Sequence, residues 1–305
     1  MDFKNLKGNL LLILAAFIWG ISFVMQDLAA VYLSPFTING VRSIIGFFAL
    51  SVLIVFMSKK TGRPIFEKTK KERVDLIVSG VLCGVFLCIA TNFQQFGIES
   101  YPASAAASGR TGFITALYVI IVPIMQVFFK KRVSLNAWVA VLFATAGMFL
   151  LCFSGSGGIY KGDVIVLCCA FAFSMQIICI DRYADRVDGV KLSAIQFLVC
   201  GILSLILMFI FEKPYIPNLI SALPYVLYLG ILSCGVAYTL QIIGQQYSKN
   251  PTVASILMSF ESVFAALAGV VIVGERFSVR ETIGCLVMFA AIILSQLPSK
   301  SKKNV

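Results

Sequence analysis

The chain has 305 residues, of which 59% are hydrophobic and only 13% are charged, and its mean hydropathy is +0.95. Soluble domains are about half apolar and a quarter charged, so this composition excludes an ordinary soluble domain. The net charge of +11 would suit a nucleic-acid partner, but the placement of the basic residues argues against one.

Ten apolar runs follow one another along the chain, each close to the ~20 residues that a helix needs to cross a bilayer. They cover residues 8–28, 36–58, 74–97, 102–129, 134–152, 162–182, 191–211, 220–244, 251–273 and 279–298. The first run follows Lys4 and Lys7 as a signal peptide would, but nine more runs after it favour a retained helix. The predicted fold class is therefore an all-α membrane protein with ten transmembrane helices.

The segments between these runs differ strongly in basic charge. If the N-terminus is cytoplasmic, the cytoplasmic segments hold nineteen basic residues, seven of them in the 59–73 loop, and the outer segments hold four. This excess follows the positive-inside rule. It predicts that both termini are cytoplasmic in the plasma (inner) membrane, and it explains the net charge without nucleic acid.

The cysteine and histidine content argues against metal chemistry. The nine cysteines lie in or at the ends of apolar runs without the spacing of paired ligands, as small apolar residues in helix cores do. The chain has no histidine, which excludes a histidine-containing zinc site or catalytic triad. No metal and no cofactor are predicted.

The second half of the sequence repeats the plan of the first. GNLLLILAAFIWG at 8–20 resembles GDVIVLCCAFAFS at 162–174, and YPASA at 101–105 resembles NPTVA at 250–254. KRVS at 131–134 then matches ERFS at 275–278. Three matches in the same order predict two five-helix copies, residues 1–153 and 154–305.

Because five is an odd number, the second copy must enter the membrane from the opposite side to the first. Two inverted copies are typical of secondary transporters, whose substrate site lies near the midplane between the repeats. Exchange of conformation between the copies would then turn an inward-facing state into an outward-facing one. The repeat pattern therefore predicts alternating access.

Residues 255–294, SILMSFESVFAALAGVVIVGERFSVRETIGCLVMFAAIIL, resemble the EamA-type repeat of the drug/metabolite transporter superfamily. The similarity includes Gly274-Glu275-Arg276 after the ninth helix and Gly284 in the tenth. FIWGISF at 17–23, and Arg42 after Ser34-Pro35-Phe36, resemble the first-repeat signature of that family. The resemblance covers nearly the whole chain. It implies a ten-helix transporter, usually an exporter of small metabolites. The lack of a histidine base and of an HExxH or P-loop motif argues against an enzyme.

Arg110 is the first candidate for a site residue. It follows Pro102 by eight residues, about 12 Å into the membrane, where an arginine is costly unless it faces protein or water. Ser108 belongs to a stripe of hydroxyl groups beside it. We predict that Arg110 and Ser108 face a wet cavity and that the guanidinium binds an anionic group of the substrate. A fixed ion pair between Arg110 and a neighbouring helix is the alternative.

Glu261 lies at a comparable depth from the opposite side, ten residues after Pro251. A buried carboxylate near an arginine can take up and release a proton, so Glu261 is a candidate for substrate binding and for proton coupling. The alternative is that it serves only as the partner of Arg110. Arg42 and Asp27 lie at similar depth near the outer interface and are predicted to form a structural ion pair.

Amide and aromatic side chains recur at helical spacing in three runs. Trp19 shares a face with Ser22 and Gln26, Asn92 shares one with Gln95, and Tyr238 shares one with Gln241. Such groups can hydrogen-bond a zwitterion or a heterocycle, or they can join helices to one another. The predicted substrate-binding set from these faces is Trp19, Asn92, Gln95, Tyr238 and Gln241.

No nucleotide-binding motif is present, so transport must be driven by an ion gradient or by the gradient of the substrate itself. We predict a secondary transporter that exports an amino acid or a related organic anion or zwitterion, with H+ as the candidate coupling ion. A channel-like facilitator and a lipid-flipping protein are the alternatives. Its expected partners are the small-molecule substrate and the lipid bilayer. The sequence leaves the substrate, the direction and the oligomeric state open.

Overall fold

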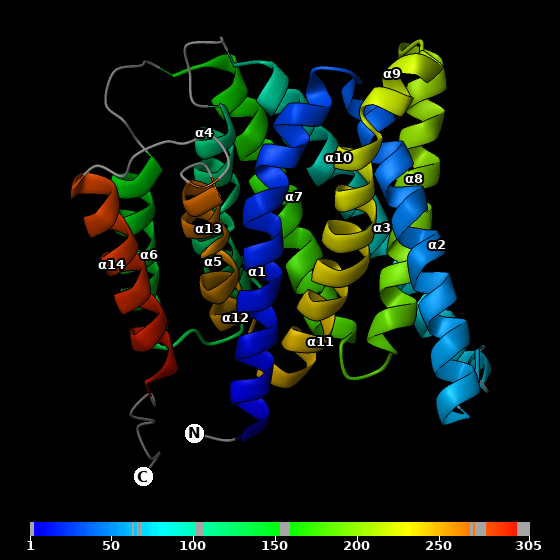
Figure 1. Cartoon of the computed structure of the whole chain (residues 1–305). Coiled ribbons are helices and arrows are strands. Elements are labelled where there is room, and N and C mark those ends of the chain that lie inside the picture. The colour runs from blue at the N-terminus through cyan, green and yellow to red at the C-terminus, as the bar shows by residue number, and fades with distance from the viewer. Residues whose placement is uncertain are drawn as a thin grey trace.

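The computed structural model describes residues 3–62, 64–65, 67, 69–101, 107–152, 159–268, 271 and 279–297. Over these residues the regular structure is helical and contains no strand. The helices form a bundle with roughly aligned axes, and α1 begins at the end of the bundle where α14 finishes (Figure 1).

The longest helices of the bundle are continuous. They are α1 (Phe3–Ala30), α2 (Pro35–Thr61), α3 (Lys70–Glu99), α6 (Leu135–Cys152), α7 (Lys161–Tyr183), α8 (Gly189–Phe211) and α14 (Val279–Gln296). The remaining helical segments are shorter: α4 (Ala107–Thr115), α5 (Tyr118–Phe128), α9 (Ile216–Ser221), α10 (Leu223–Leu227), the π-helix η1 (Tyr228–Ala237), α11 (Tyr238–Ser248), α12 (Pro251–Met258) and α13 (Glu261–Ala268).

Local sequence signals account for several helix ends. Thr69 accepts a hydrogen bond from the Glu72 N–H while the Glu72 carboxylate accepts one from the Thr69 N–H, a capping box at the start of α3. The Asp188 side chain caps α8 by accepting from the Val190 and Lys191 N–H groups, and Asn250 caps α12 just before Pro251. Gly62 ends α2 at a φ of 68°, a left-handed conformation that glycine adopts without strain.

Eight helical stretches of the described residues are long and apolar enough to cross a membrane. Two further apolar helices, Leu135–Leu150 in α6 and Thr282–Ser295 in α14, are shorter. Large apolar side chains such as Phe48, Val52 and Phe56 are exposed on the outside of α2, where lipid would cover them. The chain is therefore a multi-pass helical membrane protein. The count of ten spans, the inverted relation of the two halves and the side of the termini stay predictions.

Two of the spans are interrupted, and a third contains a π-helix. Residues 116–117 break the helix between α4 and α5, and residues 259–260 break it between α12 and α13. Short bonds bridge the first break, from the Val119 N–H to the Ala116 carbonyl (3.0 Å) and from the Ile120 N–H to the Leu117 carbonyl (2.9 Å). Irregular backbone inside a membrane protein is tolerated where it is buried in protein or lines a cavity. π-helical turns likewise gather at functional sites.

Close helix contacts hold the broken span against α1. A Cβ added at Gly20 would lie 2.5 Å from the Phe264 Cβ, so α1 approaches α13 as closely as a glycine allows. At the other end of α1, Gly8 and Gly244 meet in the same manner. These contacts fix the rotation of α1 and with it the direction in which its polar face points.

Replacing Gly20 tests this packing. We expect Gly20→Ala to lower the stability of the purified protein by about 1–3 kcal/mol, the usual cost of overpacking. Gly112→Ala is the matched control, because a Cβ there would meet the Phe23 ring at an ordinary 3.7 Å. Thermal unfolding in detergent can be followed with a thiol-reactive dye, since buried free cysteines such as Cys83 and Cys169 become reactive on unfolding. Equal midpoints for the two variants would contradict the packing argument.

Candidate functional site

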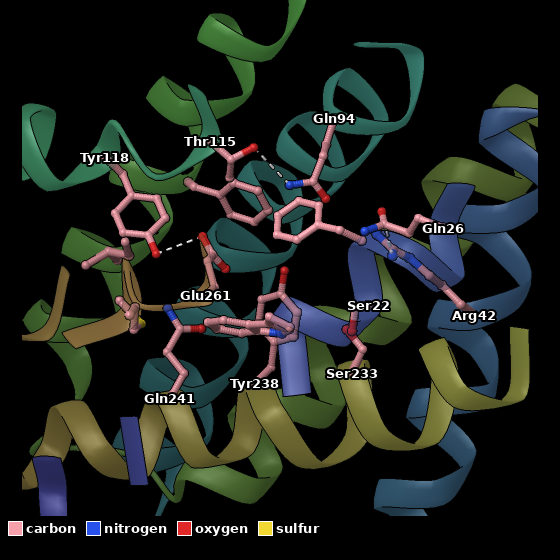
Figure 2. A pocket seen from close by; sticks show the side chains of 15 residues that line it. Ser22, Gln26, Arg42, Gln94, Thr115, Tyr118, Ser233, Tyr238, Gln241 and Glu261 are labelled. Atoms are coloured by element: carbon pink, nitrogen blue, oxygen red, sulfur yellow. Dashed lines mark hydrogen bonds between the residues drawn. The ribbon is translucent and has the colours of Figure 1, made fainter. Parts of the chain in front are cut away.

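A polar cavity lies inside the bundle, where α1, α2, α3 and α7 meet the interrupted and π-helical spans (Figure 2). Its volume is about 40 Å³. That space suits about three water molecules. The polar lining residues are Trp19, Ser22, Gln26, Arg42, Gln94, Thr115, Tyr118, Ser233, Tyr238, Gln241 and Glu261.

The irregular backbone of the two broken spans borders this cavity. Thr115 and Tyr118 stand on either side of the break between α4 and α5, and Met258 and Glu261 stand on either side of the break between α12 and α13. Ser233 belongs to the π-helix η1. The helix interruptions therefore bring side chains from both halves of the chain to one place.

Two opposite charges are buried in the cavity wall. Arg42 and Glu261 are each only 4% exposed. Arg42 donates from Nη1 to Gln26 Oε1 (3.2 Å), and Glu261 Oε1 accepts a hydrogen bond from the Tyr118 hydroxyl (2.9 Å). No ion pair of the described residues joins Arg42 to Glu261, and Figure 2 shows them at separate parts of the cavity. Each charge is thus held by a neutral neighbour and not by the other.

Three polar atoms of the cavity wall have no hydrogen-bond partner among the residues that the structure describes. They are the Trp19 indole Nε1, the Arg42 Nε and the Gln241 Oε1. A buried group without a partner costs about 1–3 kcal/mol, and more when it is charged, so such atoms are rare in folded proteins. Two of them are donors and one is an acceptor. A bound molecule that carries both an acceptor and a donor would satisfy them.

Aromatic and apolar side chains form the rest of the wall. The Trp19 and Tyr238 rings meet edge to face at 4.7 Å, and Phe197 supports Tyr238 from behind at 5.1 Å. The apolar lining is completed by Phe23, Phe173, Ile177 and Met258. Because packed rings have few rotamers to exchange, this side of the cavity is held in a fixed shape.

Four of the predicted site residues lie together at the cavity: Trp19, Tyr238, Gln241 and Glu261. Helical spacing explains the placement. Ser22 and Gln26 share the face of Trp19 and also line the cavity, and Gln241 follows Tyr238 by one turn of α11. That these side chains bind a substrate stays a prediction.

Other predicted residues lie elsewhere. Asn92 donates to the Cys88 carbonyl (2.8 Å) and to Ser204 Oγ (3.0 Å), and it accepts from Asn39, so it joins α2, α3 and α8. Gln95 does not line the cavity; its Nε2 donates to the Gln26 carbonyl instead. Its neighbour Gln94 is the residue that lines the cavity. Because α3 is buried on more than one side, polarity alone does not reveal which face meets the cavity. The Ser108 side chain lies outside the described residues.

Arg110 is the main correction to the predicted placement. Its guanidinium forms two bonds with the Asp163 carboxylate, from Nη2 to Oδ2 (2.7 Å) and from Nε to Oδ1 (3.1 Å), and it stacks over the Tyr160 ring. It does not line the cavity, and its partner is not Glu261. The reason is local: Asp163 lies in the first turn of α7, where its carboxylate also accepts a hydrogen bond from the Tyr160 N–H, so an anion already faces α4.

The predicted ion pair between Arg42 and Asp27 is also corrected, because it is absent from the ion pairs of the described residues. Asp27 is exposed on α1, whereas its neighbour Gln26 points inward and accepts from Arg42. One residue along a helix is a rotation of 100°, which is enough to exchange a lipid-facing position for a buried one. Arg42 is therefore a cavity residue that the sequence interpretation assigned to the scaffold. The polar stripe ending at Gln26 was the signal that could have located it.

Metal or cofactor chemistry has no evident centre in the described parts of the chain, since they contain no group of three His, Cys, Asp or Glu side chains that could hold an ion. The arrangement instead offers recognition. The Arg42 guanidinium, the Glu261 carboxyl group and the unpartnered Trp19 N–H and Gln241 Oε1 face one narrow space, which suits the binding of a small polar molecule.

Comparison with known proteins gives the family context. Residues 6–153 and 160–297 each match the sequence model of the EamA-like transporter family. An uncharacterized transporter of Archaeoglobus fulgidus is 28% identical over 96% of this chain and 87% of its own length. The uncharacterized transporter YwfM of Bacillus subtilis is 26% identical over 97% of both chains. A solved crystal structure matches with a TM-score of 0.76 at 18% identity, over 97% of this chain and 99% of its own, which supports the fold alone.

A double-mutant cycle tests the ion pair of Arg110 and Asp163. We expect Arg110→Ala and Asp163→Ala to be less than additive in the free energy of unfolding, with a coupling of roughly 0.5–3 kcal/mol, because each single change already removes the contact. The control combines Arg110→Ala with Asp185→Ala, because Asp185 forms an exposed ion pair with Lys249 and none with Arg110. The two changes in the free energy of unfolding should then add. Thermal unfolding of the purified variants measures both. Additivity in the first cycle would show that the pair does not join α4 to α7.

Proposed function

The chain belongs to the EamA-like transporter family, and we propose that its central cavity is the substrate site of a secondary transporter for a small zwitterion, an amino acid or a close relative. The family assignment makes the chain a membrane transporter and not an enzyme.

The observation that carries the proposal is the separated pair of buried charges, Arg42 and Glu261. A buried charge without a counter-charge is costly, and among the described residues each of these groups has only a neutral hydrogen-bond partner. A zwitterion supplies both missing counter-charges at once. Its carboxylate suits the planar fork of Arg42, whose Nε is free, and its ammonium suits Glu261.

The neutral groups of the cavity fit the same class of substrate. The free Trp19 N–H can donate to the second carboxylate oxygen, and the free Gln241 Oε1 can accept from the ammonium. The apolar lining by Phe23, Phe173 and Met258 leaves a surface for an uncharged side chain. A substrate with a second charge would find no further buried partner among the described lining residues.

Transport by alternating access requires the cavity to widen and to change the side on which it opens. Pockets that hold small ligands measure about 300–1,000 Å³, whereas the volume of this cavity is about 40 Å³. The structure therefore corresponds to a nearly closed site. The helical hydrogen-bond ladder is already interrupted at residues 116–117 and 259–260. The segments on either side of each break can therefore tilt without breaking further helical hydrogen bonds. We propose that movement at these breaks opens the cavity.

The direction and energy source are also part of the proposal. The predicted inverted repeat and the excess of basic residues on one side favour a plasma-membrane carrier with cytoplasmic termini. We propose export, driven by the gradient of the substrate or by entry of H+ with Glu261 as the proton-binding group. A channel-like facilitator and a lipid-flipping protein are the alternatives. Counterflow in proteoliposomes separates them, because only a carrier is stimulated by substrate on the opposite side.

Substitution of Arg42 tests the site directly. We expect Arg42→Lys to reduce amino-acid counterflow about tenfold or more, because a charged hydrogen bond of about 1.5–3 kcal/mol loses its bidentate geometry. Arg42→Gln should abolish counterflow while the protein stays in the membrane. Asp27→Asn is the matched control: it changes an exposed charge of α1 one residue from the Arg42 partner, and it should transport at the wild-type rate. Wild-type rates in Arg42→Lys would overturn the assignment of the carboxylate to Arg42.

Glu261→Gln separates substrate binding from proton coupling. The amide keeps the size of the side chain and can still accept from Tyr118 and from an ammonium group, but it cannot bind a proton. We expect a raised KM, continued exchange at saturating substrate, and no response of uptake to an imposed pH gradient. Uptake that still follows the pH gradient would exclude Glu261 as the coupling group. Loss of the variant from the membrane would indicate a structural role.

A further inference from the structure

A second cavity lies apart from the central one, in a groove between α2, α3 and α8. It measures about 390 Å³ and shares no lining residue with the central cavity. Its apolar walls come from all three helices: Phe47, Ile54, Val55, Leu76, Ile77, Ala194 and Ile195. Ile77 and Val55 are 55% and 41% exposed, so the groove opens to the outside of the bundle, where lipid lies.

The groove follows from where the helices can approach one another. α8 packs tightly on α3, since a Cβ added at Gly80 would lie 2.4 Å from the Ile195 side chain, and it packs tightly on the first half of α2 through Gly40 and Leu205. The groove borders the second half of α2, from Phe47 to Val55. Large side chains keep the helices apart there and leave room between them.

One end of the groove carries charges. The Lys191 Nζ forms an ion pair with Oε1 of the loop residue Glu67 (2.7 Å) and also donates to the Pro64 carbonyl (2.9 Å). Arg73 donates from Nε to the Glu67 carbonyl (2.7 Å) and makes no other hydrogen bond with a residue that the structure describes. The Glu67 carboxylate is thus neutralised by Lys191, and the two terminal nitrogens of Arg73 remain available at the mouth.

The surrounding surface is basic on balance. Lys59 and Lys60 lie in the last turn of α2, and Lys70 and Lys71 lie in the first turn of α3, all of them exposed. The acidic groups at this end of the three helices are Glu67, which is paired, Glu72, which takes part in the capping box, Asp75, and Asp188, which caps α8; Glu99 lies at the far end of α3. Basic clusters directly beside a transmembrane helix attract anionic lipid headgroups.

We propose that this groove binds one anionic glycerophospholipid, with an acyl chain between α2, α3 and α8 and the phosphate on the Arg73 guanidinium. The apolar lining of the groove suits an acyl chain, and the charge at its mouth selects the headgroup. Guanidinium groups bind phosphate oxygens in pairs, which the free terminal nitrogens of Arg73 allow. The site is separate from substrate recognition, so the proposal stands whatever the central cavity carries.

Native mass spectrometry of the purified full chain, titrated with phosphatidylglycerol or phosphatidylcholine of identical acyl chains, tests the proposal. We expect the wild type to retain one phosphatidylglycerol with about fivefold preference, the effect of one cation at an anionic lipid. Arg73→Gln should remove the preference. Lys60→Gln, which changes an exposed cation at the same end of the bundle outside the groove, should keep it. Ile77→Trp should fill the mouth and weaken retention of both lipids.

Each result decides the matter without reference to transport. Equal retention of the two lipids by the wild type would overturn the headgroup assignment. Equal losses in Lys60→Gln and Arg73→Gln would replace the site with diffuse surface charge. Unchanged binding in Ile77→Trp would place the lipid outside the groove.

Discussion

The rest of the structure depends on the burial of Arg42 and Glu261 in one cavity without contact between them. In a bundle surrounded by hydrocarbon, a buried charge needs either an opposite charge or several hydrogen bonds, and each of these has a single neutral bond. The surrounding architecture keeps them apart. Gly20 fixes α1 against α13, and the break at residues 259–260 sets the position from which Glu261 projects. The protein therefore holds an incomplete electrostatic arrangement inside a narrow cavity.

The same physical rule distinguishes the two arginines of the membrane region. Arg110 has its counter-charge in Asp163, two well-formed bonds and two aromatic rings nearby, so nothing remains for a ligand to compensate. Arg42 has one bond to an amide and a free Nε. Burial alone does not indicate a binding role, because a fully paired ion stabilises the scaffold. A buried ion without a counter-charge that faces a cavity can instead form an ion pair with a charged substrate.

The sequence predicts the helices well because apolar runs of membrane length are hard to mistake, and helical spacing correctly places Trp19 and the Tyr238–Gln241 pair at one cavity. The sequence does not predict which neighbour a side chain meets, because that depends on the rotation of each helix about its own axis. Depth along a helix is the same for Arg42 and Arg110 within a turn or two, but which neighbour each one meets depends on tertiary packing. Likewise Gln94 and Gln95 differ by 100° on a helix that is buried on more than one side, so no pattern separates them. The helix breaks and the π-helix also leave no periodic signal in an apolar run.

The incomplete arrangement also gives a reason why movement and binding would be linked. Unpartnered groups at Trp19, Arg42 and Gln241 cost less when the cavity is wide enough for water to solvate them than when it is narrow. A zwitterion that pairs with Arg42 and Glu261 removes that cost and so favours the closed arrangement over the open one. A ligand shifts a conformational equilibrium only by its difference in affinity for the two states. The buried Arg42 and Glu261 would supply this difference in affinity between the open and closed states. In the empty carrier, a proton on Glu261 would change the balance between the two states, because it removes one of the two charges. If the proposed site is the transport site, discrimination between substrates and gating of the cavity arise from the same few atoms.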